Sequence, residues 1–236
     1  MTKRREVDQD LDPPYLYPEY VATRTRSPRR PLVLLPHSLT ELSGPVLGAD
    51  RVQPGDADLT ARGTAEALGE RIIVHGRVLD SDGRPVRNAL VEVWQANAGG
   101  RYAHENDLHP APLDPNFDGL GRVVTDERGR YRFVTIKPGP YPWRNSLNAW
   151  RASHIHFSLF GDAFIQRLVT QMYFPGDPLF GQDPIFKSVP DPRGRQRMIS
   201  RLDLPESVAE WALAFRFDIV LRGREQTPME DQDDDA

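Results

Sequence analysis

KPGPYPWRNSLNAWRASHIHFSLFG, from Lys137 to Gly161, is the stretch that decides the fold. Its last third alternates polar and apolar residues, a period of two that predicts a β-strand with successive side chains on opposite faces. His154 and His156 then share one face, and Ile155 and Phe157 share the other. At about 3.3 Å per residue, the two imidazoles lie about 7 Å apart and can lean onto one metal ion. A half-buried strand with two hydrogen-bonded histidines is the alternative that this motif leaves open.

Two tyrosines are the better candidates to complete a metal site with the histidine pair. Tyr141 lies in a Gly-Pro-Tyr-Pro-Trp turn, where a proline on each side fixes its backbone. Tyr102 follows Gly-Gly-Arg, where glycine lets the backbone bend sharply. His75 sits in an apolar strand and is interpreted as structural, whereas His104 and His109 in a polar loop remain open as ligands. Taken alone, each tyrosine can equally be an ordinary loop aromatic.

The chain as a whole indicates one large β domain. Its 236 residues, 39% of them hydrophobic, can bury a good core, and its 22 prolines and 18 glycines require many turns. We predict an all-β fold, a β-sandwich of mostly antiparallel strands with long active-site loops and an extended N-terminal arm. Further strands are expected at residues 71–79, 89–95, 123–124, 131–136, 168–174 and 212–221, and one short helix at 58–68.

Three segments divide the chain in this interpretation. Residues 1–66 form the extended arm, residues 67–224 form the β-sandwich catalytic domain, and residues 225–236 form an acidic disordered tail. Within the arm, Pro31–Pro36 is apolar yet bounded by prolines, which favours a docked strand over a helix. Two long loops, at 97–121 and 175–195, interrupt the sandwich; loops of this length in a compact domain are usually functional or disordered.

Composition excludes several classes of protein. The net charge of −4 argues against general nucleic-acid binding, which requires a basic face. The chain has no cysteine, so disulfides, zinc ribbons and thiolate nucleophiles are excluded. No apolar run approaches the roughly 18 residues of a membrane-spanning helix, and the first residues lack the apolar segment of a secretory signal. We therefore expect a cytoplasmic protein that binds neither membrane nor nucleic acid.

At this point the residues resemble a known family, the intradiol ring-cleaving dioxygenases. The motifs that carry the resemblance are long: VEVWQANAGGRY (91–102), LDPNF (113–117), KPGPYPWRN (137–145), WRxxHIH (150–156) and FRFDIVLRG (215–223). It extends from Ser27 to Gly223 and departs only over residues 37–67 and in the acidic tail. Within the family, the chain looks like an iron-bearing β subunit.

The resemblance implies one non-haem Fe(III) per chain, bound by Tyr102, Tyr141, His154 and His156, with water or hydroxide as a fifth ligand. The chemistry of these residues agrees with that set. A phenol titrates near pH 10 in water, and a nearby trivalent cation strongly favours the phenolate. Two tyrosinates and one hydroxide balance the ferric charge. A catechol dianion can replace one tyrosinate and the hydroxide without changing the buried charge, and the two departing bases carry off its protons.

Further roles follow from the same resemblance. Arg151 matches an arginine beside the bound ring, where a guanidinium can stabilise charge developing on carbon; an exposed strand-edge arginine is the alternative. Gln171, on the polar side of its strand, resembles a catalytic residue that supports the site. Tyr141 is expected to act as a base as well as a ligand. The substrate-binding residues implied are Trp143 and Ile185 on the two faces of the ring, and Tyr20 and Arg144 at a carboxylate.

The reaction implied is cleavage of protocatechuate (3,4-dihydroxybenzoate) with O2 to 3-carboxy-cis,cis-muconate, in aromatic compound degradation through the β-ketoadipate pathway. The implied partner is a homologous α subunit that forms the active-site interface, within a higher αβ oligomer. Another diol (catechol, hydroxyquinol or gallate) is the alternative substrate. A non-enzymatic transthyretin-like or carbohydrate-binding module is the alternative class, which the tyrosines and the histidine pair together argue against.

Overall fold

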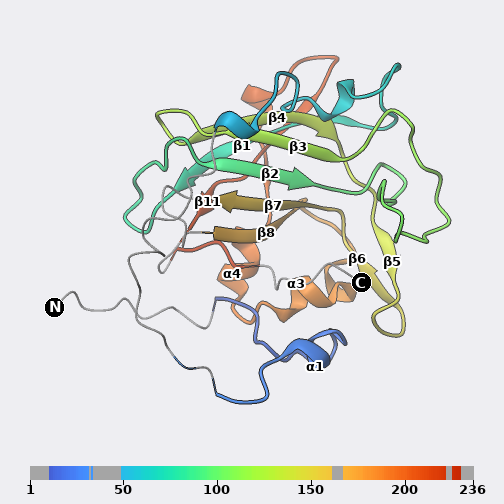
Figure 1. The fold of residues 1–236 in the computed structure, drawn as a ribbon, viewed down its shortest axis with the longest axis vertical. Coiled ribbons are helices and arrows are strands. Elements are labelled where there is room, and N and C mark those ends of the chain that lie inside the picture. The colour runs from blue at the N-terminus through green and yellow to red at the C-terminus, as the bar shows by residue number, and fades with distance from the viewer. Residues whose placement is uncertain (1–10, 32, 34–48, 161–166, 222–224, 230–236) are drawn as a thin grey trace.

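The computed structural model describes residues 11–31, 33, 49–160, 167–221 and 225–229. Two large β-sheets pack against each other, and a two-stranded sheet lies beside them (Figure 1). The first large sheet contains β1 (Arg71–Leu79), β4 (Arg130–Ile136), β9 (Arg201–Leu202), β10 (Leu213–Arg216) and β11 (Ile219–Val220). The second contains β2 (Leu90–Trp94), β3 (Leu120–Val124), β7 (His154–Phe160) and β8 (Arg167–Tyr173), in the order β3-β2-β7-β8. The small sheet pairs β5 (Tyr141–Trp143) with β6 (Ala149–Arg151).

Helices within the described residues are few and short, and the strands predominate, which confirms the all-β prediction. They are α1 (Thr23–Arg26), α3 (Pro184–Ser188) and α4 (Pro192–Arg197), with 3-10 turns η1 (Ala49–Arg51), η2 (Leu59–Ala61), η3 (Phe180–Gln182) and η4 (Leu204–Glu206). Most strand pairs are antiparallel, as predicted, although β1 pairs in parallel with β10 and β11. Within the described ranges, no helix has the length and apolar character needed to cross a membrane.

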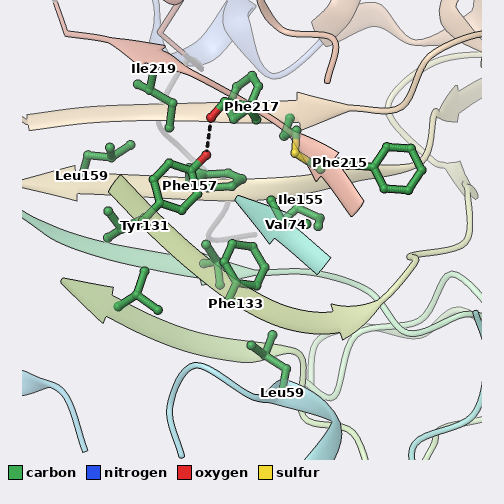
Figure 2. Packing of buried hydrophobic residues seen from close by; sticks show 14 of the residues in the cluster. Leu59, Val74, Tyr131, Phe133, Ile155, Phe157, Leu159, Phe215, Phe217 and Ile219 are labelled. Carbon is green, nitrogen blue, oxygen red and sulfur yellow. Dashed lines mark hydrogen bonds between the residues drawn. The ribbon is translucent and has the colours of Figure 1, made fainter. Parts of the chain in front are cut away.

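The core lies between the two large sheets, and β7 supplies its centre (Figure 2). Ile155, Phe157 and Leu159 are fully buried there, as the period of two in the sequence predicts. The Phe157 ring packs against Phe133 of β4 and against Phe217, with ring centroids 6.0 and 5.3 Å apart. The side chains on one face of β7 pack in the core, so the side chains on its other face point away from the core.

The predicted strand at 212–221 is wrong as a single element, because β10 ends at Arg216 and β11 begins at Ile219. Both pieces pair with the same edge of β1. Between them, the Asp218 carboxylate accepts the Arg77 backbone N–H at 3.0 Å, in place of the carbonyl that a continuous strand would offer. Phe217 keeps its place in the core across this break, so the alternation of buried residues survives although the strand does not.

Residues 175–195, expected to form an irregular loop, contain η3, α3 and most of α4. Both α-helices begin with the same local signal, an aspartate followed by proline. Asp183 and Asp191 accept backbone N–H groups of the first turn, and Pro184 and Pro192 occupy the start of each helix. The expected helix at 58–68 is wrong beyond the three residues of η2, because the following chain docks on Asn116, whose side chain accepts the Ala65 N–H.

The described part of the N-terminal segment lies against the sandwich rather than apart from it. Leu59 is fully buried in the core, and Val134 donates its N–H to Ala57. Nearer the N-terminus, Leu11 is also buried. Most of the strand expected at Pro31–Pro36 and most of the acidic tail fall outside the described residues, so the three-segment division stays a prediction.

Tyr131 anchors the break between β10 and β11. Its hydroxyl donates to the Phe217 carbonyl at 2.5 Å inside the core (Figure 2). Burial, with a smaller contribution from the Asp218 charge, raises the pKa of Tyr131 well above its usual value of about 10. The hydroxyl is therefore protonated at neutral pH and can donate.

We predict that Tyr131→Phe lowers the free energy of unfolding by about 1–3 kcal/mol, because it leaves a buried carbonyl without a donor. Urea unfolding followed by circular dichroism measures the change. Tyr15→Phe is the matched control, since Tyr15 is 60% exposed and should change stability little. Equal unfolding midpoints for the two variants would contradict the anchoring role.

Candidate metal centre

His154 and His156 lie on the face of β7 that points away from the core, as the sequence predicts. Each is only 2% exposed. Their Nε2 atoms are 3.2 Å apart, so the two imidazoles converge on one point. The His156 ring stacks on Trp94 of the neighbouring strand β2, with centroids 4.7 Å apart and planes 10° apart, which fixes its orientation.

His154 is held as a neutral imidazole with a defined tautomer. Its Nδ1 lies 2.6 Å from the Ala152 carbonyl oxygen, and because a carbonyl only accepts, Nδ1 donates. Burial, followed by the nearby Arg151 charge and by His156, lowers the pKa of His154 well below its usual 6.5. In a neutral ring with a protonated Nδ1, Nε2 carries a lone pair. That lone pair points toward the shared position.

Tyr102 and Tyr141 complete the cluster of rings. The Tyr102 hydroxyl lies 3.0 Å from His156 Nε2. The Tyr141 ring lies 5.7 Å from the rings of both Tyr102 and His154, measured between centroids. The structure thus brings together the four side chains that the resemblance implies as ligands, although they come from three separate segments of the chain.

Close backbone contact between two glycines and their neighbours presses the Tyr102 loop onto the Tyr141 turn. Gly100 has a φ of +78°, and a Cβ there would lie 2.3 Å from the Pro140 carbonyl oxygen. A Cβ at Gly139 would lie 2.3 Å from the Ala98 carbonyl oxygen. Only glycine fits at either position, which accounts for the sharp bend expected before Tyr102.

The donor set fits a hard trivalent metal rather than a site of histidines and carboxylates. In the ranges that the structure describes, no three His, Cys, Asp or Glu side chains gather closely enough to hold a metal ion. His104 and His109, left open as ligands by the sequence, therefore join no such group. His75, expected to be structural, belongs to β1 in the first large sheet, and its Nε2 lies 3.3 Å from the Asp203 carboxylate. A metal at the His154–His156 pair would depend on phenolate oxygens for its anionic ligands.

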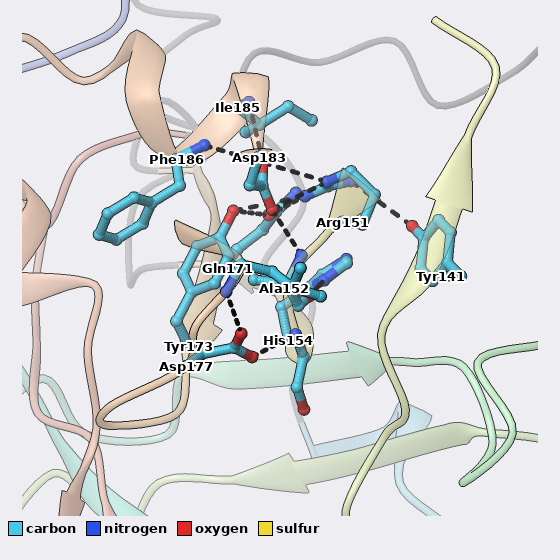
Figure 3. Close-up of polar contacts among 12 residues, drawn as sticks. Tyr141, Arg151, Ala152, His154, Gln171, Tyr173, Asp177, Asp183, Ile185 and Phe186 are labelled. Carbon is cyan, nitrogen blue, oxygen red and sulfur yellow. Dashed lines mark hydrogen bonds and ion pairs between the residues drawn. The ribbon is translucent and has the colours of Figure 1, made fainter. Parts of the chain in front are cut away.

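Arg151 lies beside Tyr141 in a buried polar network (Figure 3). It is 2% exposed, which excludes the alternative of an exposed strand-edge arginine. Its Nε pairs with the Asp183 carboxylate at 3.2 Å, and one terminal nitrogen donates to Gln171. Its other terminal nitrogen lies 3.5 Å from the Tyr141 hydroxyl. Gln171 is fully buried and sits directly opposite His156 in the pairing of β7 with β8.

Two members of this network, Asp183 and Tyr173, are absent from the sequence-based candidates. Both are fully buried, and the Tyr173 hydroxyl donates to Gln171 at 2.5 Å. The Asp-Pro start of α3 was the available signal for Asp183. Tyr173 shares a strand face with Gln171, two residues away, so the period of two was its signal.

The four proposed substrate-contacting residues occupy different surroundings. The Trp143 ring contacts both the Tyr20 ring, with centroids 5.0 Å apart, and the Arg151 guanidinium, whose carbon lies 5.3 Å from the Trp143 centroid. Tyr20 is only 2% exposed, with the guanidinium of Arg26 over its ring. Ile185 is buried in α3, whereas Arg144 is exposed in the connection between β5 and β6.

The chain is similar in sequence to known dioxygenases. Residues 42–223 match the family model described as "Dioxygenase", and residues 12–38 match "Protocatechuate 3,4-dioxygenase beta subunit N terminal". The chain is 59% identical to the protocatechuate 3,4-dioxygenase beta chain of Burkholderia cepacia, over 94% of this chain and 95% of that one. It is 30% identical to the protocatechuate 3,4-dioxygenase alpha chain of Pseudomonas putida, over 84% and 97%.

The fold agrees with these matches. The structure of catechol 1,2-dioxygenase from Acinetobacter sp. ADP1 superposes with a TM-score of 0.54 at 26% identity, covering 76% of this chain and 61% of that one. The all-β sandwich, the ring cluster on β7 and the match over residues 42–223 lead to one conclusion. The chain belongs to the intradiol dioxygenase family of enzymes.

Proposed function

We propose that this chain is the iron-bearing β subunit of a protocatechuate 3,4-dioxygenase, which cleaves 3,4-dihydroxybenzoate with O2 to 3-carboxy-cis,cis-muconate. The observation that carries the proposal is the cluster of two imidazole and two phenol rings around the buried pair His154 and His156. Tyr102 lies 3.0 Å from His156, whose Nε2 lies 3.2 Å from that of His154. The 59% identity to a named beta chain supports the choice of substrate.

Fe(III) is the metal that this donor set suits. Phenolates are hard anionic ligands, and the neutral imidazole of His154 offers a lone pair. When bound, a ferric ion would supply Lewis acidity, which favours phenolate over phenol and favours ionisation of a diol. We propose Tyr102, Tyr141, His154 and His156 as its protein ligands, with one ion per chain.

The two tyrosines have different roles in this proposal. Tyr102 stays in place, since its hydroxyl lies directly against His156. Tyr141 accepts a proton from the incoming diol and swings aside, which lets the substrate ionise at neutral pH. Its hydroxyl faces Arg151, whose guanidinium can stabilise the released phenol oxygen and the charge that develops on the substrate ring.

The substrate ring is proposed to lie between Trp143 and Ile185, because a flat apolar ligand suits aromatic and aliphatic walls. Its carboxylate is proposed to meet Arg144 and Tyr20. Arg144 is exposed and so is accessible to an anion, and Tyr20 contacts Trp143 directly. Gln171 holds one side of the Arg151 guanidinium and thereby keeps it aimed at the site.

A homologous α subunit is the proposed partner, within a higher αβ oligomer. The described arm carries exposed apolar side chains, with Tyr15 60% and Leu16 52% exposed. Surfaces of this kind are often covered by another chain. Similarity to a protocatechuate 3,4-dioxygenase alpha chain supports a pair built from two related sandwiches.

The test of the proposed function is product analysis with the α subunit co-produced. Protocatechuate should consume one O2 per ring cleaved, and both atoms of 18O2 should appear in 3-carboxy-cis,cis-muconate. Catechol and hydroxyquinol serve as competing substrates. Preferential turnover of catechol or hydroxyquinol would identify that diol as the substrate instead. Cleavage of the ring bond beside the two hydroxyl-bearing carbons, rather than between them, would contradict the proposal.

The tyrosine assignment predicts different defects for two otherwise equal substitutions. Tyr141→Phe should keep its iron, because three protein ligands remain, but should slow formation of the doubly ionised substrate complex and shift the pH profile of turnover. Tyr102→Phe should instead change the visible spectrum of both the resting enzyme and the substrate complex. Anaerobic stopped-flow spectroscopy with protocatechuate measures both. If Tyr102→Phe has the slow step and Tyr141→Phe does not, the two roles are reversed.

A further inference from the structure

Asp183 is fully buried, and both of its carboxylate oxygens accept hydrogen bonds from more than one group. Its Oδ1 accepts the backbone N–H groups of Ile185 at 2.9 Å and Phe186 at 3.1 Å, at the start of α3. Its Oδ2 accepts the Ala152 N–H at 3.0 Å. Both oxygens also lie within 3.3 Å of Arg151 Nε (Figure 3).

These contacts determine how Arg151 presents its guanidinium. Asp183 binds Nε, which leaves both terminal nitrogens for other partners. One meets Gln171 and the Tyr173 hydroxyl, and the other lies 3.5 Å from the Tyr141 hydroxyl. A guanidinium is planar and rigid, so fixing one edge by a charged pair fixes the direction of the opposite edge.

The same carboxylate also connects two other segments beside the site, the residues just before β7 and the start of α3. The Ala152 peptide that donates to Asp183 belongs to the residue whose carbonyl accepts from His154 Nδ1. The N–H groups at the start of α3 belong to the turn that carries Ile185. One side chain therefore ties the arginine, the histidine strand and the proposed ring-contacting helix together, 32 residues along the chain from Arg151.

We propose that Asp183 is a positioning residue for the reaction: its carboxylate balances the buried charge of Arg151 and aims the guanidinium at Tyr141 and the substrate ring. This inference rests on the proposed function, because the aimed group acts on the bound diol. An isolated buried guanidinium is unfavourable, so without the carboxylate it turns toward other acceptors or water.

Asp183→Asn tests the role, because it removes the charge and keeps one acceptor for the start of α3. It also puts an amide donor where Oδ2 accepts the Ala152 N–H, a change that the control variant Asp177→Asn shares. We expect kcat for protocatechuate to fall about ten- to a hundred-fold, the size of effect that a small misplacement of a catalytic group produces. KM should stay within about threefold, and iron content and the visible spectrum of the resting enzyme should match the wild type.

Asp177→Asn is the matched control. Asp177 accepts the N–H of Ser153 at 2.9 Å and of Leu179 at 2.9 Å, so it bridges nearly the same two segments. Among the described residues it forms no ion pair. Its amide should therefore leave kcat within about twofold of the wild type. An equal loss in both variants would assign Asp183 to the fold alone.

A double-mutant cycle with Arg151→Met separates positioning from structure. Asp183→Asn should cost nothing further, within about twofold, in the Arg151→Met background. An equal further loss in that background would overturn the proposal. If Asp183→Asn alone does not fold but the double variant folds with its iron, the carboxylate is confirmed as the partner of the arginine charge. If neither variant folds, the proposal is wrong.

A different result would contradict the proposed function itself: wild-type enzyme that contains no iron or does not cleave protocatechuate.

Discussion

The period of two along β7 is the constraint on which the rest of the structure depends. The strand is paired on both edges, by β2 and by β8, so every side chain must go to one face or the other. Ile155 and Phe157 fill the space between the sheets, and His154 and His156 are thereby placed on the opposite face. A shift of the strand by one residue would put imidazoles in the core and phenylalanine at the candidate metal centre.

The outer face of β7 becomes a site because two other segments are pressed onto it. Gly100 and Gly139 allow the Tyr102 loop and the Tyr141 turn to meet at distances that no other residue permits. Arg151 then brings a positive charge into the buried region. That charge helps to keep His154 neutral, and it is balanced by Asp183 rather than by any group that the substrate must displace.

The sequence allowed prediction of the features that depend on neighbouring residues, such as strands with alternating polar and apolar side chains. Strand β1 was predicted to the residue, and the histidine pair, its face and the adjacent tyrosine turn followed from alternation and from proline. The break between β10 and β11 could not be predicted, because a side chain, that of Asp218, replaces a backbone acceptor without disturbing the apolar pattern. Asp183 was missed for a related reason, since its partner Arg151 lies in a distant segment; only the Asp-Pro signal marked it as a helix start.

Metal content and colour test the central claim most directly, since the account depends on phenolate oxygens joining two imidazoles at one ion. Protein purified with the proposed α subunit should contain one iron per copy of this chain and absorb visible light through tyrosinate-to-iron charge transfer. Tyr102→Phe and Tyr141→Phe should each alter that absorption, whereas Tyr131→Phe, in the core, should leave it unchanged. A colourless protein that contains zinc and retains full activity would contradict the account.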